Sequence, residues 1–512
     1  MLRLNKTGHY ETYMENRFAE ENAFHLMSQE ALPLPDFHST KSLLPSPFWE
    51  GHDSVLSCYW RAWELAFTNL RTPVPKSGFV ANFVDTAFND CLFMWDSAFI
   101  LAFGRYGRRA FDFQRTLDNL YAKQHADGFI CREIGTFDGL DRFERFDPAS
   151  TGPNAVSWSE WEHYMSTGDR ERLSRVFPVL VAYHQWLRAY RTWPNGMYWA
   201  SGLASGMDNL PRFPKKAVRK GLPERLLYHG HLVWMDACAQ QALSAELLLR
   251  MADVLGRREE VEDMQKEREW LASMINECLW DEKTAFYYDE RRGGELSGVK
   301  TVGAYWGLLA GVVPESRVAS FIGHLEDPVE FDRPHRVPSL SADHPEYSKD
   351  GGYWLGGVWP PTNHVVLGGL ERTGCRRLAH EIARNDLEEV TRVFERTETL
   401  WENYSPEKPE PGTPAKRDFV GWGGLAPIAG LFEYVFGLRA EAPSDRLVWN
   451  VRLLEEHGVR RYPFGRDAVV DLHCAARSSA RKEPQIRVNS DAALELVIRW
   501  EGGERCLQVR GR

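Results

Sequence analysis

Hydrophobic residues recur at helical spacing through most of the chain, from about residue 52 to residue 438. One segment places five of them at successive intervals of three, one, three and one residues, namely Leu173, Val176, Phe177, Leu180 and Val181. This spacing puts the five side chains in one stripe along a helix face. Asp169 lies just upstream, where a carboxylate is a favourable N-cap.

A second long helix is predicted further along the chain. Its apolar positions are Leu232, Met235, Ala239, Ala242 and Leu243. The pattern continues through ELLLRMADVL to Gly256, where a left-handed C-terminal cap is expected. Helices of this kind recur to the end of the region.

The two ends of the chain have different patterns. The stretch ALPLPDFHSTKSLLPSPFWEG lies near the start, and its prolines forbid a continuous helix. After about residue 440, the runs RLVWNVRL, AVVDLHCA and LELVIRW predict short strands. We therefore expect an N-terminal arm over residues 1–50 that packs on a helical domain over 51–440, followed by a small β-rich domain over 441–512.

Loops with many potentially functional side chains separate the predicted helices. They are rich in Gly, Pro, Trp and Asp, as in GLASGMDNLPRF, GGYWLGGVWPPTN and WENYSPEKPEPG. Loops of this kind on a helical scaffold indicate function at one rim. No internal repeat is visible, so the helix pattern alone allows either a toroid of hairpins or a solenoid.

Composition adds a preference for small-molecule chemistry. The chain has 19 Trp, more than a core needs to fill its volume, and these rings are suited to stacking on sugar C–H faces. The net charge of −10 comes from interspersed charges of both signs, which excludes a basic stripe for nucleic acid.

Targeting and cysteine signals are weak. The start, MLRLNKTGHYETYMENR, lacks the apolar run of a signal peptide, and no run approaches the length of a membrane span, so a cytoplasmic protein is expected. The eight cysteines show no C-x-x-C spacing, which favours reduced thiols over disulfides or zinc. The histidines form no H-E-x-x-H motif, and we expect neither a metal nor a cofactor.

Two carboxylic acids stand in loops that suit catalysis. Asp208 lies between Gly206 and Pro211, where apolar neighbours would raise its pKa and keep it protonated. The alternative is an Asx-turn, a frequent role for Asp in loops. Glu402 lies between Trp401 and Tyr404 in LWENYSPE.

Glu402 also has a simpler interpretation as a helix-terminal residue ion-paired at the surface. Glu407 and Glu410 compete with it on composition alone. Asp96, in FMWDSAFIL, could accept hydrogen bonds from two sugar hydroxyls while Trp95 stacks on the ring, and it could at the same time cap a helix that begins at Ser97.

Taken in order, the motifs of this chain resemble those of glycoside hydrolase family 63. The likeness is greatest to its mannosylglycerate and glucosylglycerate hydrolase-like branch, and family 37 trehalases are more distant. It spans about residues 50–440 and rests on MWDSAF, KQHADGF, GPNAVSWSEWEHYMSTGD, SGMDNLPR, CLWDEKTAFYYD, GGYWLGGVWPPTN, WENY and GWGGLAPIAGLFEYVFGL.

The resemblance implies an (α/α)6 toroid and an inverting α-glycosidase acting on a small α-glucoside or α-mannoside. It implies Asp208 as general acid and Glu402 as general base, at a separation of ~6.5 to 9.5 Å that leaves room for a water molecule. It places substrate-binding roles at Trp95, Asp96, Gln124, Trp158, Asn209, Arg212, Trp359, Tyr404 and Trp422.

Two departures from the family pattern concern the substrate. Leu355 stands where many relatives have Arg, and His364 stands where relatives often have an aromatic residue. Binding of an anionic leaving group would require a cationic side chain, which Lys123, Arg132 or Arg212 could supply. A sugar phosphorylase or epimerase on the same toroid, and a catalytically inactive sugar-binding protein, are the competing functions.

Overall fold

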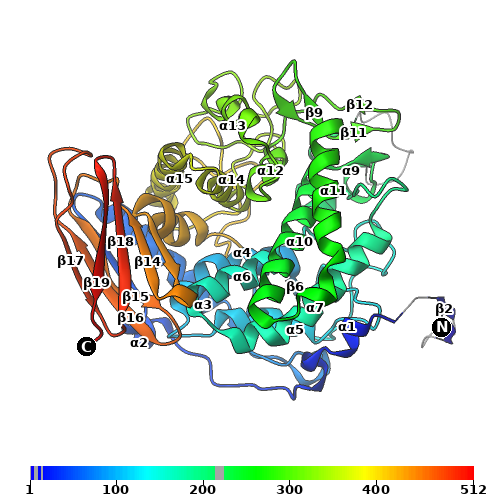
Figure 1. Cartoon of the computed structure of the whole chain (residues 1–512), viewed down its shortest axis with the longest axis horizontal. Coiled ribbons are helices and arrows are strands. Elements are labelled where there is room, and N and C mark those ends of the chain that lie inside the picture. The colour runs from blue at the N-terminus through cyan, green and yellow to red at the C-terminus, as the bar shows by residue number, and fades with distance from the viewer. Residues whose placement is uncertain (1, 5–9, 13–14, 214–223) are drawn as a thin grey trace.

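Six helical segments form the centre of the molecule. The computed structural model describes residues 2–4, 10–12, 15–213 and 224–512 (Figure 1). Each segment contacts the next, and the last contacts the first. In order they are α4 (Met94–Gly104), α6 (Val156–Thr167), α10 (Met235–Leu255), α12 (Trp306–Leu309), α14 (Pro360–Arg372) and the π-helical segment η10 (Leu425–Val435).

A second set of helices packs outside this circuit. It comprises α3 (Asp53–Thr68), α5 (Thr116–Tyr121), α7 (Arg170–Tyr190), α11 (Asp263–Cys278) and α15 (Arg376–Thr397). Each of them contacts the neighbouring segment of the central six, as α11 does with α10, and these two run side by side in Figure 1. Segment η10 is buried along its whole length, whereas α15 buries one face, because central segments pack on all sides.

Two caps predicted for the long helices are confirmed. Asp169 caps α7, and its side chain accepts a hydrogen bond from the Arg172 N–H. Gly256 closes α10 with a φ of +74°, in the left-handed region. One prediction was wrong at the start of α10, since Leu232 belongs to the short strand β8 (Leu232–Val233), which pairs with β11 (Glu290–Arg291).

The C-terminal part is β-rich, and each of the three predicted strand runs forms a strand. One sheet has the order β13 (Leu438–Glu441), β14 (Arg446–Asn450), β18 (Leu494–Trp500) and β19 (Gly503–Val509). The other has the order β17 (Ile486–Ser490), β16 (Ala468–Cys474), β15 (His457–Phe464) and β3 (Ser46–Trp49). Figure 1 shows both sheets at one side of the helices.

Strand β3 ties the N-terminal segment to the C-terminal sheets. It pairs antiparallel with β15 in the register His457 to Trp49, although more than 400 residues separate the two strands in the chain. The preceding segment contains α1 (Arg17–Glu20), which contacts α7, and α2 (Phe37–Thr40), which contacts α3. Residues 1, 5–9 and 13–14 of the expected arm lie outside the described residues.

The remaining strands are short; two of them precede the first helix, and the others lie in the connections between helices. They are β1 (Leu2–Leu4), β2 (Tyr10–Thr12), β4 (Leu70–Arg71), β5 (Phe83–Val84), β6 (Cys91–Phe93), β7 (Glu133–Gly135), β9 (Trp280–Asp281), β10 (Phe286–Tyr287) and β12 (Glu295–Leu296). The pair of β6 with β7 leads directly into α4 and therefore helps to place the start of that helix.

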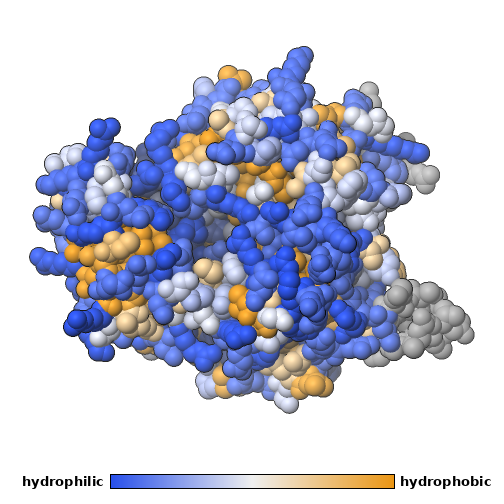
Figure 2. Space-filling model, viewed as in Figure 1, coloured by the Kyte–Doolittle hydropathy of each residue, from blue (hydrophilic) through white to orange (hydrophobic). Residues whose placement is uncertain are grey.

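Hydrophilic residues cover most of the face seen in Figure 2, with smaller hydrophobic patches between them. Among the described residues, no helix is long and apolar enough to cross a membrane. All eight cysteines are free, and five of them are buried.

Gly437 lies between the helices and the C-terminal sheets, and its substitution tests how tightly this junction is packed. Its φ is +80°, and a Cβ atom there would lie 2.2 Å from the carbonyl oxygen of Asn450 on β14. Gly256 has a similar φ, but a Cβ atom there would meet nothing within 4 Å. We expect Gly256→Ala to cost about 1 to 2 kcal/mol for the left-handed backbone alone. Gly437→Ala should cost more, because β14 must also move.

Thermal unfolding of the two variants measures this difference. A clearly lower melting temperature for Gly437→Ala than for Gly256→Ala is the expected result. Equal losses would mean that the contact between Gly437 and β14 is not tight in solution.

Candidate active site

A pocket opens where several of the six central segments begin. Trp95 and Asp96 reach it from the first turn of α4, Trp359 from the residue before α14, and Trp422 from the turn before η10. Asp208 and Glu402 complete the polar lining. The pocket therefore brings together six residues that the sequence placed at a sugar site, from segments more than 300 residues apart.

Asp96 is buried inside the first turn of a helix. Helix α4 begins at Met94, with Phe93 as its N-cap, so the prediction that Asp96 caps a helix starting at Ser97 was wrong. The strand β6 runs straight into the helix and leaves no separate cap residue. Burial raises the pKa of Asp96 to about 7, although the nearby Arg132 opposes the rise.

Asp208 lies in a loop and is half-buried. Burial raises its pKa to about 6, against the opposing charge of Arg132 and with a further rise from the Glu402 carboxylate. The Leu210 N–H, which an Asx-turn at Asp208 would use, donates to the Met207 carbonyl instead, while the N–H of Asp208 itself lowers the pKa of its carboxyl group. In the described part of the chain, no neighbouring side chain donates a hydrogen bond to the Asp208 carboxyl group.

Glu402 is buried and held by two donors. The Tyr353 hydroxyl donates to Oε1 over 3.1 Å, and the Lys416 N–H donates to Oε2 over 3.0 Å. Burial raises the pKa of Glu402, while these two contacts lower it. The residue lies beyond the end of α15, so it is not the helix-terminal surface glutamate of the alternative interpretation.

The competing glutamates stand elsewhere. Glu407 forms an ion pair with Arg333 at 2.8 Å and accepts a hydrogen bond from the Tyr347 hydroxyl, while Glu410 is exposed. Neither of them lines the pocket.

Aromatic rings form one wall of the pocket. Trp354 and Trp359 stack with ring centroids 3.9 Å apart and an interplanar angle of 4°. Trp359 also meets Trp422 edge-on at 5.7 Å. The Trp422 indole N–H donates to the Glu402 carbonyl over 2.6 Å, which ties this wall to the backbone of the carboxylate.

Gln124 and Trp158 lie outside the pocket lining, contrary to their predicted roles. The amide nitrogen of Gln124 donates to the carbonyls of Gly128 and Val179, and its oxygen accepts from Asn22, so both ends of the side chain are occupied in the interior. Trp158 stacks on His364 beside a separate internal cavity, with ring centroids 5.3 Å apart.

Tyr404, which was predicted to bind substrate, is also outside the pocket lining. Its backbone pairs with Val358 in both directions, and its hydroxyl accepts a hydrogen bond from the Trp401 N–H. The ring is buried beneath the pocket, so Tyr404 supports the lining without contributing to it.

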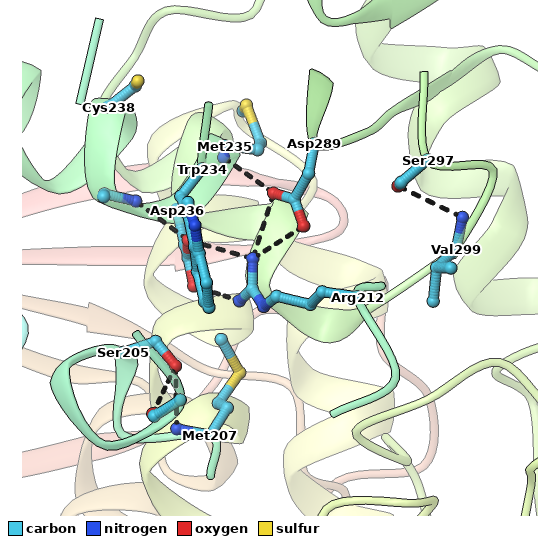
Figure 3. Close-up of polar contacts among 12 residues, drawn as sticks. Ser205, Met207, Arg212, Trp234, Met235, Asp236, Cys238, Asp289, Ser297 and Val299 are labelled. Atoms are coloured by element: carbon cyan, nitrogen blue, oxygen red, sulfur yellow. Dashed lines mark hydrogen bonds and ion pairs between the residues drawn. The ribbon is translucent and has the colours of Figure 1, made fainter. Parts of the chain in front are cut away.

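Arg212 is buried in an ion cluster behind the Asp208 loop. Figure 3 shows its guanidinium group between the carboxylates of Asp236 and Asp289, with the Trp234 ring beside it. The side chain is only 2% exposed, and both of its Nη atoms are engaged. Arg212 is therefore not available to a substrate in this arrangement. Asn209 is also outside the pocket lining, and both polar ends of its side chain bond to the backbone of a neighbouring loop.

Sequence reasoning missed Tyr353 as a site residue and gave Arg132 only as an optional cation. Arg132 lines the pocket, where its side chain is 12% exposed and pairs with Glu133 at 3.0 Å. Lys123, the other optional cation, lies outside the lining. Arg132 follows the KQHADGF motif closely, and Tyr353 stands inside GGYWLGG, so proximity to these motifs was the available signal.

The pocket lining also includes apolar and charged residues near Arg132. Phe88 is 43% exposed at the pocket, close to Phe93 and Phe419, and Glu133 lies beside Arg132. Burial raises the pKa of Glu133, and Arg132 lowers it. Among the described residues, no group of three or more His, Cys, Asp or Glu is arranged to hold a metal ion.

Comparison with known proteins identifies the family. Residues 91–420 match the family model described as "Mannosylglycerate hydrolase MGH1-like glycoside hydrolase domain". A mannosylglycerate hydrolase of Thermus thermophilus is 27% identical over 360 residues, which cover 57% of this chain and 85% of that protein.

Solved structures agree at the level of the fold. The family 63 mannosylglycerate hydrolase from a second strain of Thermus thermophilus, in complex with glucose, has a TM-score of 0.58 at 23% identity and covers 72% of this chain and 98% of its own. The neutral trehalase of Saccharomyces cerevisiae has a TM-score of 0.53 at 13% identity and covers 71% of this chain and 76% of its own. The chain therefore belongs to glycoside hydrolase family 63, in its mannosylglycerate hydrolase-like branch.

Proposed function

We propose that this protein is an inverting α-glycosidase in which Asp208 is the general acid and Glu402 the general base. The observation that carries the proposal is that two carboxyl groups in one pocket differ in their hydrogen-bond donors and therefore in the protonation state that is favoured. Asp208 has a pKa raised to about 6 and no side-chain donor among the described residues, which favours the protonated form that an acid needs. Glu402 accepts two hydrogen bonds, which favour the ionised form that a base needs.

In the proposed reaction, protonated Asp208 donates its proton to the glycosidic oxygen as the bond to the anomeric carbon breaks. Glu402 removes a proton from a water molecule that attacks this carbon from the opposite face. Asp96 would bind sugar hydroxyls, and Trp95, Trp359 and Trp422 would enclose the ring.

We also propose that the central helices and their outer partners form an (α/α)6 toroid, as a helical domain over about residues 51–440 between an N-terminal arm and a C-terminal β-rich domain. The closed circuit of contacts through α4, α6, α10, α12, α14 and η10 supports this, as does the fold likeness to the family 63 and trehalase structures. The mouth of the pocket would then be one rim of the toroid.

The substrate we propose is a short α-glucoside or α-mannoside of the glucosylglycerate, mannosylglycerate or disaccharide type. The Thermus enzyme has been solved with the sugar glucose. It has also been solved with Tris and the small anion D-glycerate. Arg132 is the one cationic side chain in the described pocket lining, and it would serve an anionic leaving group in place of the arginine that Leu355 replaces.

Removal of either carboxylic acid tests the assignment. We expect Asp208→Asn and Glu402→Gln each to lower the rate of glycoside hydrolysis by 10³-fold or more, since proton transfer and activation of water then lose their agents (contributions of about 10² to 10⁴ each). The measurement is sugar release from a panel of glucosylglycerate, mannosylglycerate, trehalose, kojibiose and nigerose, with and without phosphate.

Two exposed carboxylates provide matched controls. Asp350→Asn and Glu410→Gln change the same charge outside the pocket and should retain the wild-type rate. Full activity in Asp208→Asn or Glu402→Gln would refute the assignment. A requirement for phosphate would favour a phosphorylase.

The raised pKa of Asp208 also predicts how stability depends on pH. Between pH 4 and 6, the folded protein holds this proton more firmly than the unfolded chain does, because the folded pKa of about 6 exceeds the ordinary value. The contribution of Asp208 to stability therefore falls as pH rises through this window. Asp208→Asn should raise the melting temperature at pH 8 by a few degrees and change it little at pH 4.

Asp350→Asn, which changes the same charge outside the pocket, is the control for this measurement as well. An equal change in melting temperature at pH 4 and pH 8 for Asp208→Asn would contradict the raised pKa.

A further inference from the structure

A single side chain joins the two loops that carry the opposite sides of the proposed reaction. The Asn209 amide nitrogen donates to the Gly352 carbonyl over 3.0 Å, and its oxygen accepts from the Trp354 N–H over 2.8 Å. Asn209 directly follows the proposed acid Asp208. The two backbone groups that it binds flank Tyr353, whose hydroxyl donates to the proposed base Glu402.

The backbone at Tyr353 needs to be held in place. Its φ is +66°, in the left-handed region, which a bulky aromatic residue rarely adopts. Asn209 bonds to the residue on each side of it. An amide is the neutral side chain that offers one donor and one acceptor side by side, so no aliphatic or hydroxyl side chain of similar size could make the same two contacts.

The loop of Asp208 is itself anchored on both sides of Asn209. Met207 is buried before it, and the Met207 N–H donates to the Ser205 hydroxyl over 3.2 Å. Arg212 is fixed after it by Asp236 at the start of α10 and by Asp289 (Figure 3). A displacement at Asn209 therefore cannot be absorbed by a free loop end, and it passes to Asp208 or to Tyr353.

We infer that Asn209 is a positioning residue that sets the separation of the acid and base, and that it acts through Tyr353 on Glu402. The inference rests on the proposed function. It replaces the predicted role of Asn209 in binding substrate, because both polar ends of its side chain are engaged with protein backbone.

Glycosyl fluorides distinguish the loss of the acid from a displacement of the base. Fluoride leaves without a proton from the acid, so Asp208→Asn should retain hydrolysis of α-glucosyl or α-mannosyl fluoride while losing hydrolysis of O-glycosides. Asn209→Ala removes the link between the two loops and should lower kcat by about 10²-fold on both kinds of substrate, the usual effect of a displacement near 1 Å. KM should change much less than kcat.

Restoration by a carboxyl group provides a second measurement. A protonated Asp at position 209 offers a hydroxyl donor to Gly352 and a carbonyl acceptor to Trp354, whereas an ionised one cannot donate. The ratio of the Asn209→Asp rate to the Asn209→Ala rate should therefore rise as the pH falls from about 7 towards 5.

Asn276 is a matched structural control. Its amide nitrogen donates to the carbonyls of Ala272 and Val312, far from the pocket lining. The Asn276 side-chain oxygen also accepts from the Tyr287 hydroxyl and from Arg317. Asn276→Ala therefore removes at least as many contacts as Asn209→Ala does, and it should lower the melting temperature while leaving kcat unchanged.

An activity-independent measurement keeps the two proposals distinguishable. Hydrogen exchange by mass spectrometry should show faster exchange in peptides covering residues 352–359 of Asn209→Ala, because the Trp354 N–H loses its acceptor. Unchanged exchange there, wild-type kcat in Asn209→Ala, or a rise in KM alone would each overturn the inference. If the wild-type protein hydrolyses neither fluorides nor glycosides, the proposed function fails, and the exchange result still decides whether Asn209 joins the two loops.

Discussion

The ion cluster of Arg212 with Asp236 and Asp289 is the constraint on which the pocket most depends. All three side chains are buried, and the cluster has two carboxylates for one guanidinium group. Removing one partner from a buried pair typically costs about 3 to 5 kcal/mol, because a charge is then left without compensation. The cluster therefore fixes the end of the Asp208 loop to the start of α10, one of the six central segments.

From this anchor, the site is built across the chain. The starts of α4, α14 and η10 supply Asp96, Trp359 and Trp422, while the loops between helices supply Asp208 and Glu402. The start of a helix favours an ionised carboxylate by about 0.3 to 1 kcal/mol. At Asp96 the effect of burial is larger, since its pKa is raised to about 7.

Much of this arrangement could be predicted from local sequence. The cap at Asp169, the end of α10 at Gly256 and the three C-terminal strands follow from patterns within a few residues, and each forms as expected. The pairing of β3 with β15 could not be predicted, because nothing local in either segment specifies a partner more than 400 residues away.

The site residues divide along the same line. Asp208 and Glu402 stand in loops whose flanking residues suit catalysis, but local sequence left simpler alternatives open and the family resemblance implied their roles; both line the pocket. Gln124, Trp158, Asn209, Arg212 and Tyr404 were assigned to substrate from family resemblance, and each lies outside the lining in the protein interior or at a loop contact. Which way such a side chain points depends on tertiary contacts, so sequence could not separate a support residue from a binding residue.

We propose that water attacks the anomeric carbon directly, with Asp208 and Glu402 on opposite faces of the sugar. Proton NMR of the first sugar released from an α-linked substrate tests this claim most directly. Inversion predicts that the β-anomer appears first and then mutarotates towards equilibrium. Initial release of the α-anomer would mean retention through a covalent intermediate and would contradict the assignment of Glu402 as a base.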